Sequence, residues 1–368
     1  MRYGWMIPAA CVFLTLFGCG QTGEECAEVR SDVTLIPVDS IGREMGDSNY
    51  VFGMINTADF TADGNLVVGD LLRMRILMYS PEGEFLHSGG SRGEGPGQFG
   101  SPTGMFPTPD GGVAVSDRNG AKIIFYDSCL HLKRELGGFR PYPPNQLVVL
   151  DDGAIVGTRF SFNRAEGDIA NALQRWEQGE IEPSITYREV AGEIVPGNFQ
   201  KTFQQVAMDF DVFSDGRVVL SPASTEEYIL ECYDPQGELL WRRDLPFERC
   251  RVPEEELELQ RDLIRQNLRR SGRNPEMADE FELEEWALAV VDLQVVADKE
   301  IWVRRGHTVV PLFDVYDPQG ELQYTCTVPD LPYGRGVGFA ISEHGMLAYL
   351  AQPEDYAKLY ILQLTGRS

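Results

Sequence analysis

The chain has 368 residues, of which 43% are hydrophobic, so it is long enough to bury a large core. Its 57 acidic and 32 basic residues give a formal net charge of −25. A surface of this sign repels phosphate backbones, so we expect no nucleic-acid partner.

An apolar segment lies at the N-terminus. Arg2 precedes an uncharged apolar run from Trp5 to Phe17, which is too short to span a bilayer comfortably and has signal-peptide proportions. The run ends in Leu16-Phe17-Gly18-Cys19, which resembles the bacterial lipobox. The resemblance implies that residues 1–18 are a lipoprotein signal peptide, that Cys19 carries the lipid, and that residues 19–31 are a linker. An ordinary signal peptide and an uncleaved anchor are the alternatives.

The lipobox resemblance implies a location in the bacterial cell envelope, with the lipid on Cys19 as the membrane anchor. Gly20 stands where many lipoproteins of the inner membrane have Asp, which favours the outer membrane. The cysteines that would remain are Cys26, Cys129, Cys232, Cys250 and Cys326. Their odd number leaves at least one free thiol, and their pairing cannot be read from the sequence. They form no Cys-x-x-Cys pair, so we expect no zinc and no other cofactor.

A polar turn followed by a short apolar strand recurs along the chain. The turns, mostly Asp-Gly, lie at 63–65, 110–112, 152–153, 215–216, 298–300 and 344–345. Each unit continues with a second strand that ends at an aromatic residue, and several then have a Pro-Gly turn such as that in Tyr79–Gly83. Pro presets φ and Gly supplies the positive φ that closes a hairpin. Short strands at this spacing are typical of an all-β propeller.

The last unit supplies only three strands, near residues 337–340, 346–350 and 358–364. The segment 33–42 is a strand with no unit of its own. We expect it to join the last blade as its outermost strand, because this closes the ring and protects the sheet edge. The sequence therefore predicts an all-β, six-bladed β-propeller over residues 32–368.

One unit carries a more specific pattern. The segment from Gly93 to Met105 is similar to the G-x-G-P-G-Q-F-x-x-P-x-G entry of NHL repeats, and residues 110–126 fit the rest of that repeat. The chain thus resembles the six-bladed propellers of the NHL-repeat and TolB-like type, among which bacterial lipoproteins are common. This resemblance implies a fold and no particular activity.

The segment 253–287, between the fourth and fifth units, is rich in Glu, Arg and Leu. Apolar residues at 257, 263, 264 and 268 form a helical stripe, and Pro253 with the acidic residues after it suits a helix start. A break at 271–275 and later apolar residues predict a second helix. This helical hairpin would emerge on the face that carries the loops between second and third strands. It is either a lid or docking platform, or a decoration that only adds stability.

The loops of that face carry many cations for so acidic a chain. The candidate anion-binding residues are Arg73, Arg118, Arg159, Arg304 and His307. If they converge, their guanidinium groups suit carboxylates or phosphates. Arg75 and Lys122, at equivalent repeat positions, are expected instead to tie neighbouring loops together.

Two functions follow from these patterns. The first is a lipid-anchored binding module that engages a protein or an acidic glycan through this loop face. The alternative is a divalent-metal-dependent hydrolase or lyase, lactonase-like, with a site at the central channel and Asp70, Asp117 and His307 as metal ligands. No His-Glu-x-x-His or P-loop pattern is present, which favours the binding module over the enzyme.

Overall fold

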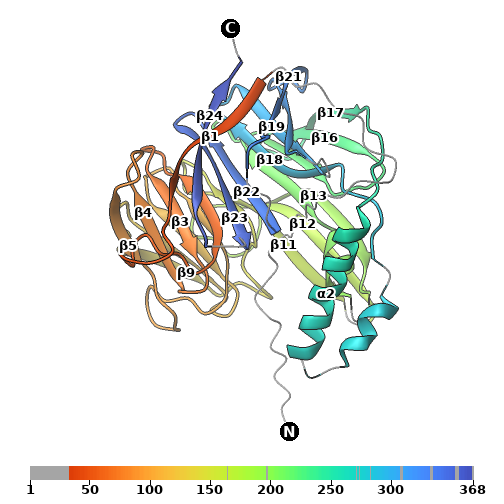
Figure 1. The fold of residues 1–368 in the computed structure, drawn as a ribbon, viewed down its shortest axis with the longest axis horizontal. Coiled ribbons are helices and arrows are strands. Elements are labelled where there is room, and N and C mark those ends of the chain that lie inside the picture. Colours follow the sequence, from red (N-terminus) through yellow and green to blue (C-terminus); the bar gives the residue numbers. More distant parts are fainter. Residues whose placement is uncertain are drawn as a thin grey trace.

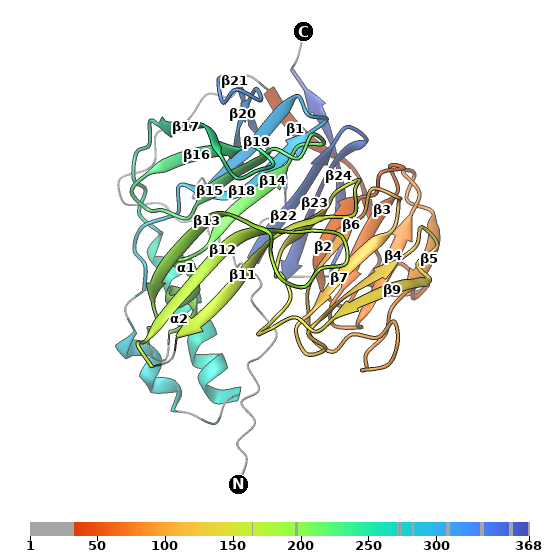
Figure 2. The same ribbon diagram turned by 180° about the vertical axis from the view of Figure 1, so that it is seen from behind.

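The computed structural model describes residues 33–366 except 164, 196–197, 271, 273, 282, 307–309, 332–334 and 353–355. Over these residues the chain has an all-β, propeller-like fold with few helices (Figures 1 and 2). Four sheets have four strands each and one sheet has eight. The predicted signal peptide, Cys19 and the linker lie outside the described residues.

The four-stranded sheets follow one another along the chain, and successive strands within each pair antiparallel. The first sheet contains β2 (Ile55–Phe60), β3 (Leu66–Asp70), β4 (Arg75–Tyr79) and β5 (Phe85–Gly89). The second contains β6 (Pro102–Pro107), β7 (Val113–Asp117), β8 (Lys122–Tyr126) and β9 (Leu132–Gly137). The third contains β10 (Leu147–Val149), β11 (Ile155–Asn163), β12 (Asp168–Trp176) and β13 (Ile185–Glu193). The fourth contains β14 (Met208–Val212), β15 (Val218–Pro222), β16 (Tyr228–Tyr233) and β17 (Leu239–Leu245).

The eight-stranded sheet combines the last strands of the chain with the first one. Its order is β18 (Val290–Val296), β19 (Glu300–Arg305), β20 (Leu312–Tyr316), β21 (Leu322–Thr327), β1 (Val33–Ile41), β24 (Leu359–Thr365), β23 (Gly345–Gln352) and β22 (Arg335–Ser342). As predicted, β1 pairs antiparallel with β24, along its length from Thr34 to Ile41. Its contact with β21 is parallel and joins only Val33 to Cys326 and Thr34 to Thr327. The sheet therefore has two halves that meet at a short parallel contact.

The turn chemistry explains why the strands begin where they do. In the first sheet, the Gly64 N–H donates to the Thr61 carbonyl and the Thr61 N–H donates to the Asn65 carbonyl, both over 2.8 Å. Gly64 has φ +80°, a conformation that glycine adopts without the steric cost of a Cβ. The outer turn after β16 uses Asp234, whose Oδ1 accepts from the N–H groups of Gln236 and Glu238.

Neighbouring sheets pack face to face. Val67 and Ile76 of the first sheet contact Met105 and Val115 of the second. The same holds where the chain closes on itself, because β2 packs against β22 and β23 and a single cluster joins Leu347 to the first sheet (Figure 2). Burial of each such side chain contributes about 1.5–3 kcal/mol. The sheets thus form a closed ring with their first strands innermost.

Two connections contain helices. The helix α1 (Phe199–Gln204) lies between β13 and β14, and α2 (Glu254–Arg270) lies between β17 and β18. In Figure 1, α2 lies at the end of the molecule opposite the C-terminus. The second predicted helix is only a 3-10 helix, Pro275–Glu280, because the backbone becomes extended at Phe281. Ala278 of this turn packs against Ile264 of α2.

The base of this insertion is a short β-bridge between Arg251 and Trp286. Cys250, next to the bridge, is disulfide-bonded, whereas Cys129, Cys232 and Cys326 are free thiols. These four are the cysteines of the described part of the chain. In that same part, no helix is both long enough and apolar enough to cross a membrane.

Candidate functional site

The strand register brings polar side chains to the innermost strands of the ring. Asp209 of β14 lies opposite Ser221 of β15, and Asp292 of β18 lies opposite Arg304 of β19. Asp211 follows Asp209 at the spacing that places both on the same face of β14. The first strands of two neighbouring sheets therefore present carboxyl groups toward each other, which a packed hydrophobic core would not do.

These carboxyls form what we call the axial cluster, consisting of Asp59 on β2 together with Asp209, Asp211 and Asp292. Each is partly exposed to water, although protein surrounds it. The charge of Asp292 acts on the other three, and Asp59 also acts on Asp211. Three sheets that are distant in the sequence thus contribute to one group of interacting acids.

Burial is the main cause of the raised pKa values in the axial cluster. It raises the pKa of Asp209 to about 7, with a further increase from Asp292 and an opposing effect of Arg304. Burial likewise raises the pKa of Asp211 to about 7, although the N–H groups of Val295 and Val212 donate to it.

The same cause acts on the other two members. Burial raises the pKa of Asp59 to about 6, against a hydrogen bond from the Phe60 N–H. It also raises the pKa of Asp292, which Arg304 and Gln294 oppose. Near neutral pH the cluster therefore contains both protonated and ionised carboxyls, the combination that acid–base catalysis requires.

Arg304 is the cation of this region. Its side chain is 3% exposed, its Nη1 donates to the Val337 carbonyl over 2.6 Å, and its guanidinium lies 5.2 Å from the centre of the Phe339 ring. Burial lowers the pKa of Arg304, whereas the charges of Asp292 and Asp209 raise it. Gln294 of β18 links β18 to β22, because its amide donates to Asp292 of its own strand and to the Phe339 carbonyl of β22.

One hydroxyl beside the axial cluster has no partner. Ser221 is 1% exposed, and its Oγ makes no hydrogen bond with any described group. Because Ser221 lies directly opposite Asp209, its side chain is on the same face of the sheet as that carboxyl. A buried hydroxyl without a partner costs about 1–3 kcal/mol, so an unsatisfied group at this point indicates a place where another molecule can bind.

The residues of this region do not fit a bound divalent cation as they stand. Carboxylate oxygens are the ligands that calcium and magnesium prefer. Among the described residues, however, no three His, Cys, Asp or Glu side chains are arranged to hold a metal ion. The guanidinium of Arg304 lies opposite Asp292 and already supplies a positive charge to the cluster.

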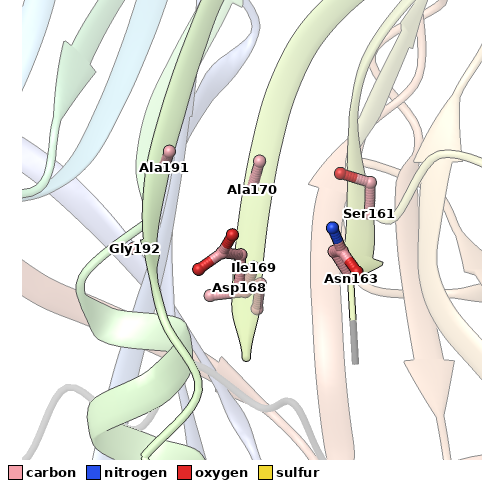
Figure 3. Close-up of a pocket in the computed structure, with 7 residues that line it drawn as sticks. All are labelled: Ser161, Asn163, Asp168, Ile169, Ala170, Ala191 and Gly192. Atoms are coloured by element: carbon pink, nitrogen blue, oxygen red, sulfur yellow. The ribbon is translucent and has the colours of Figure 1, made fainter. Parts of the chain in front are cut away.

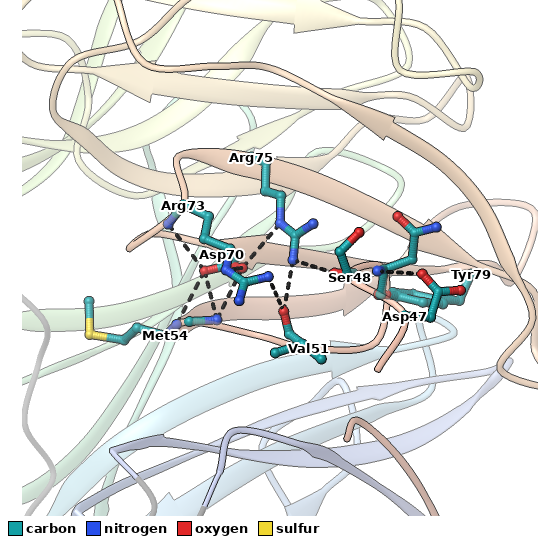
Figure 4. A network of polar contacts seen from close by, with 10 residues as sticks. Asp47, Ser48, Val51, Met54, Asp70, Arg73, Arg75 and Tyr79 are labelled. Carbon is teal, nitrogen blue, oxygen red and sulfur yellow. Dashed lines mark hydrogen bonds and ion pairs between the residues drawn. The ribbon is translucent and has the colours of Figure 1, made fainter. Parts of the chain in front are cut away.

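Asp70, one of the predicted metal ligands, organises its own loop (Figure 4). It is fully buried and accepts hydrogen bonds from the N–H groups of Gly53, Met54 and Arg73 over 3.1–3.3 Å. Arg75 Nε donates to Asp70 Oδ2 over 3.1 Å, and its Nη2 donates to the Val51 carbonyl. Arg75 therefore ties two loops together, as predicted, and Arg73 donates to the same carbonyl.

Asp117 has the same role in the second sheet. It is 1% exposed and accepts from the N–H groups of Gly100, Ser101 and Gly120. Both predicted metal ligands thus use their oxygens within their own blades. His307, the third, lies outside the described residues, so the proposed trio as a whole stays a prediction.

The predicted anion-binding arginines contact different neighbours. Arg118 donates to the Asn145 side chain and lies over the Tyr142 ring. Arg159 lies 5.4 Å from the centre of the Trp176 ring. The charge of Arg304 acts on Asp209 of the axial cluster. An anion site formed by these residues stays a prediction.

A separate hollow of about 450 Å³ lies at the extended tip of the third sheet (Figure 3). Its lining residues are Ser161, Asn163, Asp168, Ile169, Ala170, Ala191 and Gly192. They come from β11, β12 and β13, which are the longest strands of the four-stranded sheets and project at the α2 end (Figure 2).

The sequence analysis missed the aspartates of the axial cluster. A usable signal was present, because Asp209 and Asp211 alternate just before the turn at 215–216, in the segment that forms the first strand β14. Asp59 and Asp292 interrupt first strands in the same way. Charged residues on an inner strand are costly to bury, so they mark a candidate site.

No protein-family model and no curated protein matches this sequence. Solved structures do match the fold. A Bacteroides fragilis protein assigned as exported aligns over 93% of this chain and 98% of its own, with 13% identity and a TM-score of 0.52. A luciferin-regenerating enzyme aligns over 90% of this chain and 98% of its own, with 10% identity and a TM-score of 0.50. A Xanthomonas campestris gluconolactonase reaches 12% identity, 89% and 98% coverage and a TM-score of 0.48, too low to support an argument. These likenesses show a shared propeller-like fold.

Proposed function

We propose that the protein is a hydrolase that opens lactones or related cyclic esters, with the axial cluster as its active site. The observation that carries this proposal is the grouping of four aspartates with raised pKa values beside the unpartnered Ser221 hydroxyl. Perturbed carboxyls at a shared centre are characteristic of catalytic sites. The enzyme alternative is thereby favoured over a binding module, without the metal ligands first expected for it.

The proposed reaction needs one ionised and one protonated carboxyl. Asp209 and Asp211 have pKa values of about 7, so near neutral pH each spends time in both states. The ionised carboxyl accepts a proton from water as the water oxygen attacks the ester carbonyl carbon. The ring C–O bond then breaks, and the protonated carboxyl donates its proton to the leaving oxygen. The product is an open-chain hydroxy acid.

The test is hydrolysis of a panel of γ- and δ-lactones. The rate is measured as the uptake of base needed to keep the pH constant. We expect turnover by the wild type and a loss of about 100-fold or more in kcat/KM for Asp209→Asn and Asp211→Asn. Asp39→Asn is the matched control, since Asp39 is exposed on the outermost strand β1. Absence of turnover by folded wild type, or equal turnover by all three variants, would overturn the proposal.

We further propose that the ring has six blades and that the protein is exported and lipid-anchored through Cys19 in the outer membrane. The blade count follows from dividing the eight-stranded sheet at the contact between β1 and β21, where only two residue pairs join its halves. Each half then has four strands, like the other sheets. Labelling of growing cells with a radioactive or clickable fatty acid tests the anchor, and Cys19→Ser should abolish the label.

A second candidate is binding of a protein or glycan partner at the loop face. The hollow at the tip of the third sheet favours it, because Ser161, Asn163 and Asp168 offer both donors and acceptors to hydroxyl groups. The membrane would then hold this face near its partner. A thermal-shift screen with acidic glycans tests this candidate, and a shift that survives Asp168→Ala would contradict the hollow as its site.

A further inference from the structure

We infer that Arg304 is the built-in cation of the axial cluster, and that the cluster becomes a divalent-cation site only when this charge is removed. The inference concerns how the proposed active site is neutralised, so it rests on the proposed function for its importance. Its evidence is separate, because it comes from the position of one arginine among four acids.

The geometry first fixes where the arginine lies. Arg304 is the direct cross-strand neighbour of Asp292, which places the two side chains on the same face of the sheet. The guanidinium is held there by its hydrogen bond to the Val337 carbonyl and by the Phe339 ring of β22. Only 3% of the side chain is exposed, so the charge cannot move out to solvent.

The second step concerns charge. The positive charge of Arg304 acts on the carboxyls of Asp292 and Asp209. Asp59 and Asp211 interact instead with other acids and with backbone N–H groups. The phenol of Tyr349 also acts on Arg304, and the amide of Gln294 donates to Asp292; neither group carries a positive charge. Within the described residues around the cluster, Arg304 is therefore the cation that balances it.

The third step explains why a metal ion would compete with this arrangement. A divalent cation needs carboxylate oxygens converging at about 2.0–2.6 Å, and the described acids are not arranged in that way. The positive charge of Arg304, the cross-strand neighbour of Asp292, already acts on that carboxyl and on Asp209, as the charge of a bound ion would. Removing the guanidinium leaves four acids without a balancing cation, and the nearest source of charge is then an ion from solution.

The experiment compares three proteins by calorimetry at pH 7.5, in EDTA and in 1 mM calcium chloride. The proteins are the wild type, Arg304→Met and Arg304→Lys, where lysine keeps the charge. We expect calcium to raise the Tm of Arg304→Met by about 3 °C or more and to change the other two by less than about 1 °C. An arginine that only stabilises the fold would lower the Tm of Arg304→Met in both buffers without any calcium response, which would overturn the inference.

A second measurement covers the case in which Arg304→Met does not fold. In equilibrium dialysis against calcium, we expect the wild type to bind no stoichiometric calcium at the axial cluster. Stoichiometric binding by the wild type that is lost in Asp292→Asn would overturn the inference. Failure of the lactone assay together with the expected calcium response would refute the proposed reaction alone. Lactone turnover together with calcium binding by the wild type would refute the role of Arg304 alone.

Discussion

Replacing Asp209 by Asn should change how stability depends on pH. The folded state raises the pKa of this carboxyl from 3.8 to about 7. The folded protein therefore binds this proton more tightly than the unfolded protein. The contribution of proton binding to the free energy of unfolding is complete below pH 4 and is lost as the pH rises toward 7. A shift of about 3 units at 1.36 kcal/mol each gives a loss of about 4 kcal/mol, an upper limit because Asp209 is partly exposed to water.

Asn has nearly the same shape and does not ionise, so Asp209→Asn removes this loss. The free energy of unfolding, measured with urea between pH 4 and pH 8, should fall less steeply for the variant than for the wild type. The two proteins should be similar at pH 4, and the variant should be more stable at pH 8. Asp39→Asn, on an exposed carboxyl of β1, should run parallel to the wild type. A constant difference between wild type and Asp209→Asn at all pH values would refute the reasoning.

Three further predictions concern the scaffold. Asp70→Ala leaves several N–H groups and a guanidinium without their acceptor, so it should lower the free energy of unfolding by about 3–5 kcal/mol. A loss below about 1 kcal/mol would contradict the role of Asp70 in the loop. Leu35→Ala, fully buried in β1, should cost about 2–5 kcal/mol in the same assay, unless ring closure contributes little to stability. A maleimide should label Cys129 in the native protein but Cys232 and Cys326 only after denaturation, and native labelling of the buried pair would show that their sheets open.

The fold could be read from the sequence because its signals are local. Each Asp-Gly or Pro-Gly turn specifies a hairpin within a few residues, and the positive φ at Gly64 and Gly237 shows that the glycines act as expected. The partner of β1 was predictable by elimination, because the last unit lacked one strand. The second helix of the insertion was predicted too long, since apolar residues such as Phe281 follow the 3-10 helix in extended backbone and not in a helix.

The candidate site could not be read in the same way. Asp59, Asp209 and Asp292 come from three different sheets, and their proximity depends on the closure of the ring. Arg304 was assigned to a loop face because it ends a strand, but the register of β19 with β18 places it opposite Asp292. Asp70 was assigned to a metal site because it opens a loop, whereas the structure shows that its oxygens hold that loop. A local pattern identifies a charged residue but not its partners.

Three successive second strands each place a polar side chain beside the axial cluster. These side chains are Ser221 on β15, Arg304 on β19 and Tyr349 on β23. Their cross-strand neighbours are Asp209, Asp292 and Gly338. A Cβ at Gly338 would collide with the Tyr349 ring, so glycine is required for the tyrosine to lie across its neighbour. Three second strands thus supply a hydroxyl, a guanidinium and a phenol around one group of acids. Because pairing with the first strand fixes the face on which each side chain lies, the residue type on the second strand decides which group the acids meet.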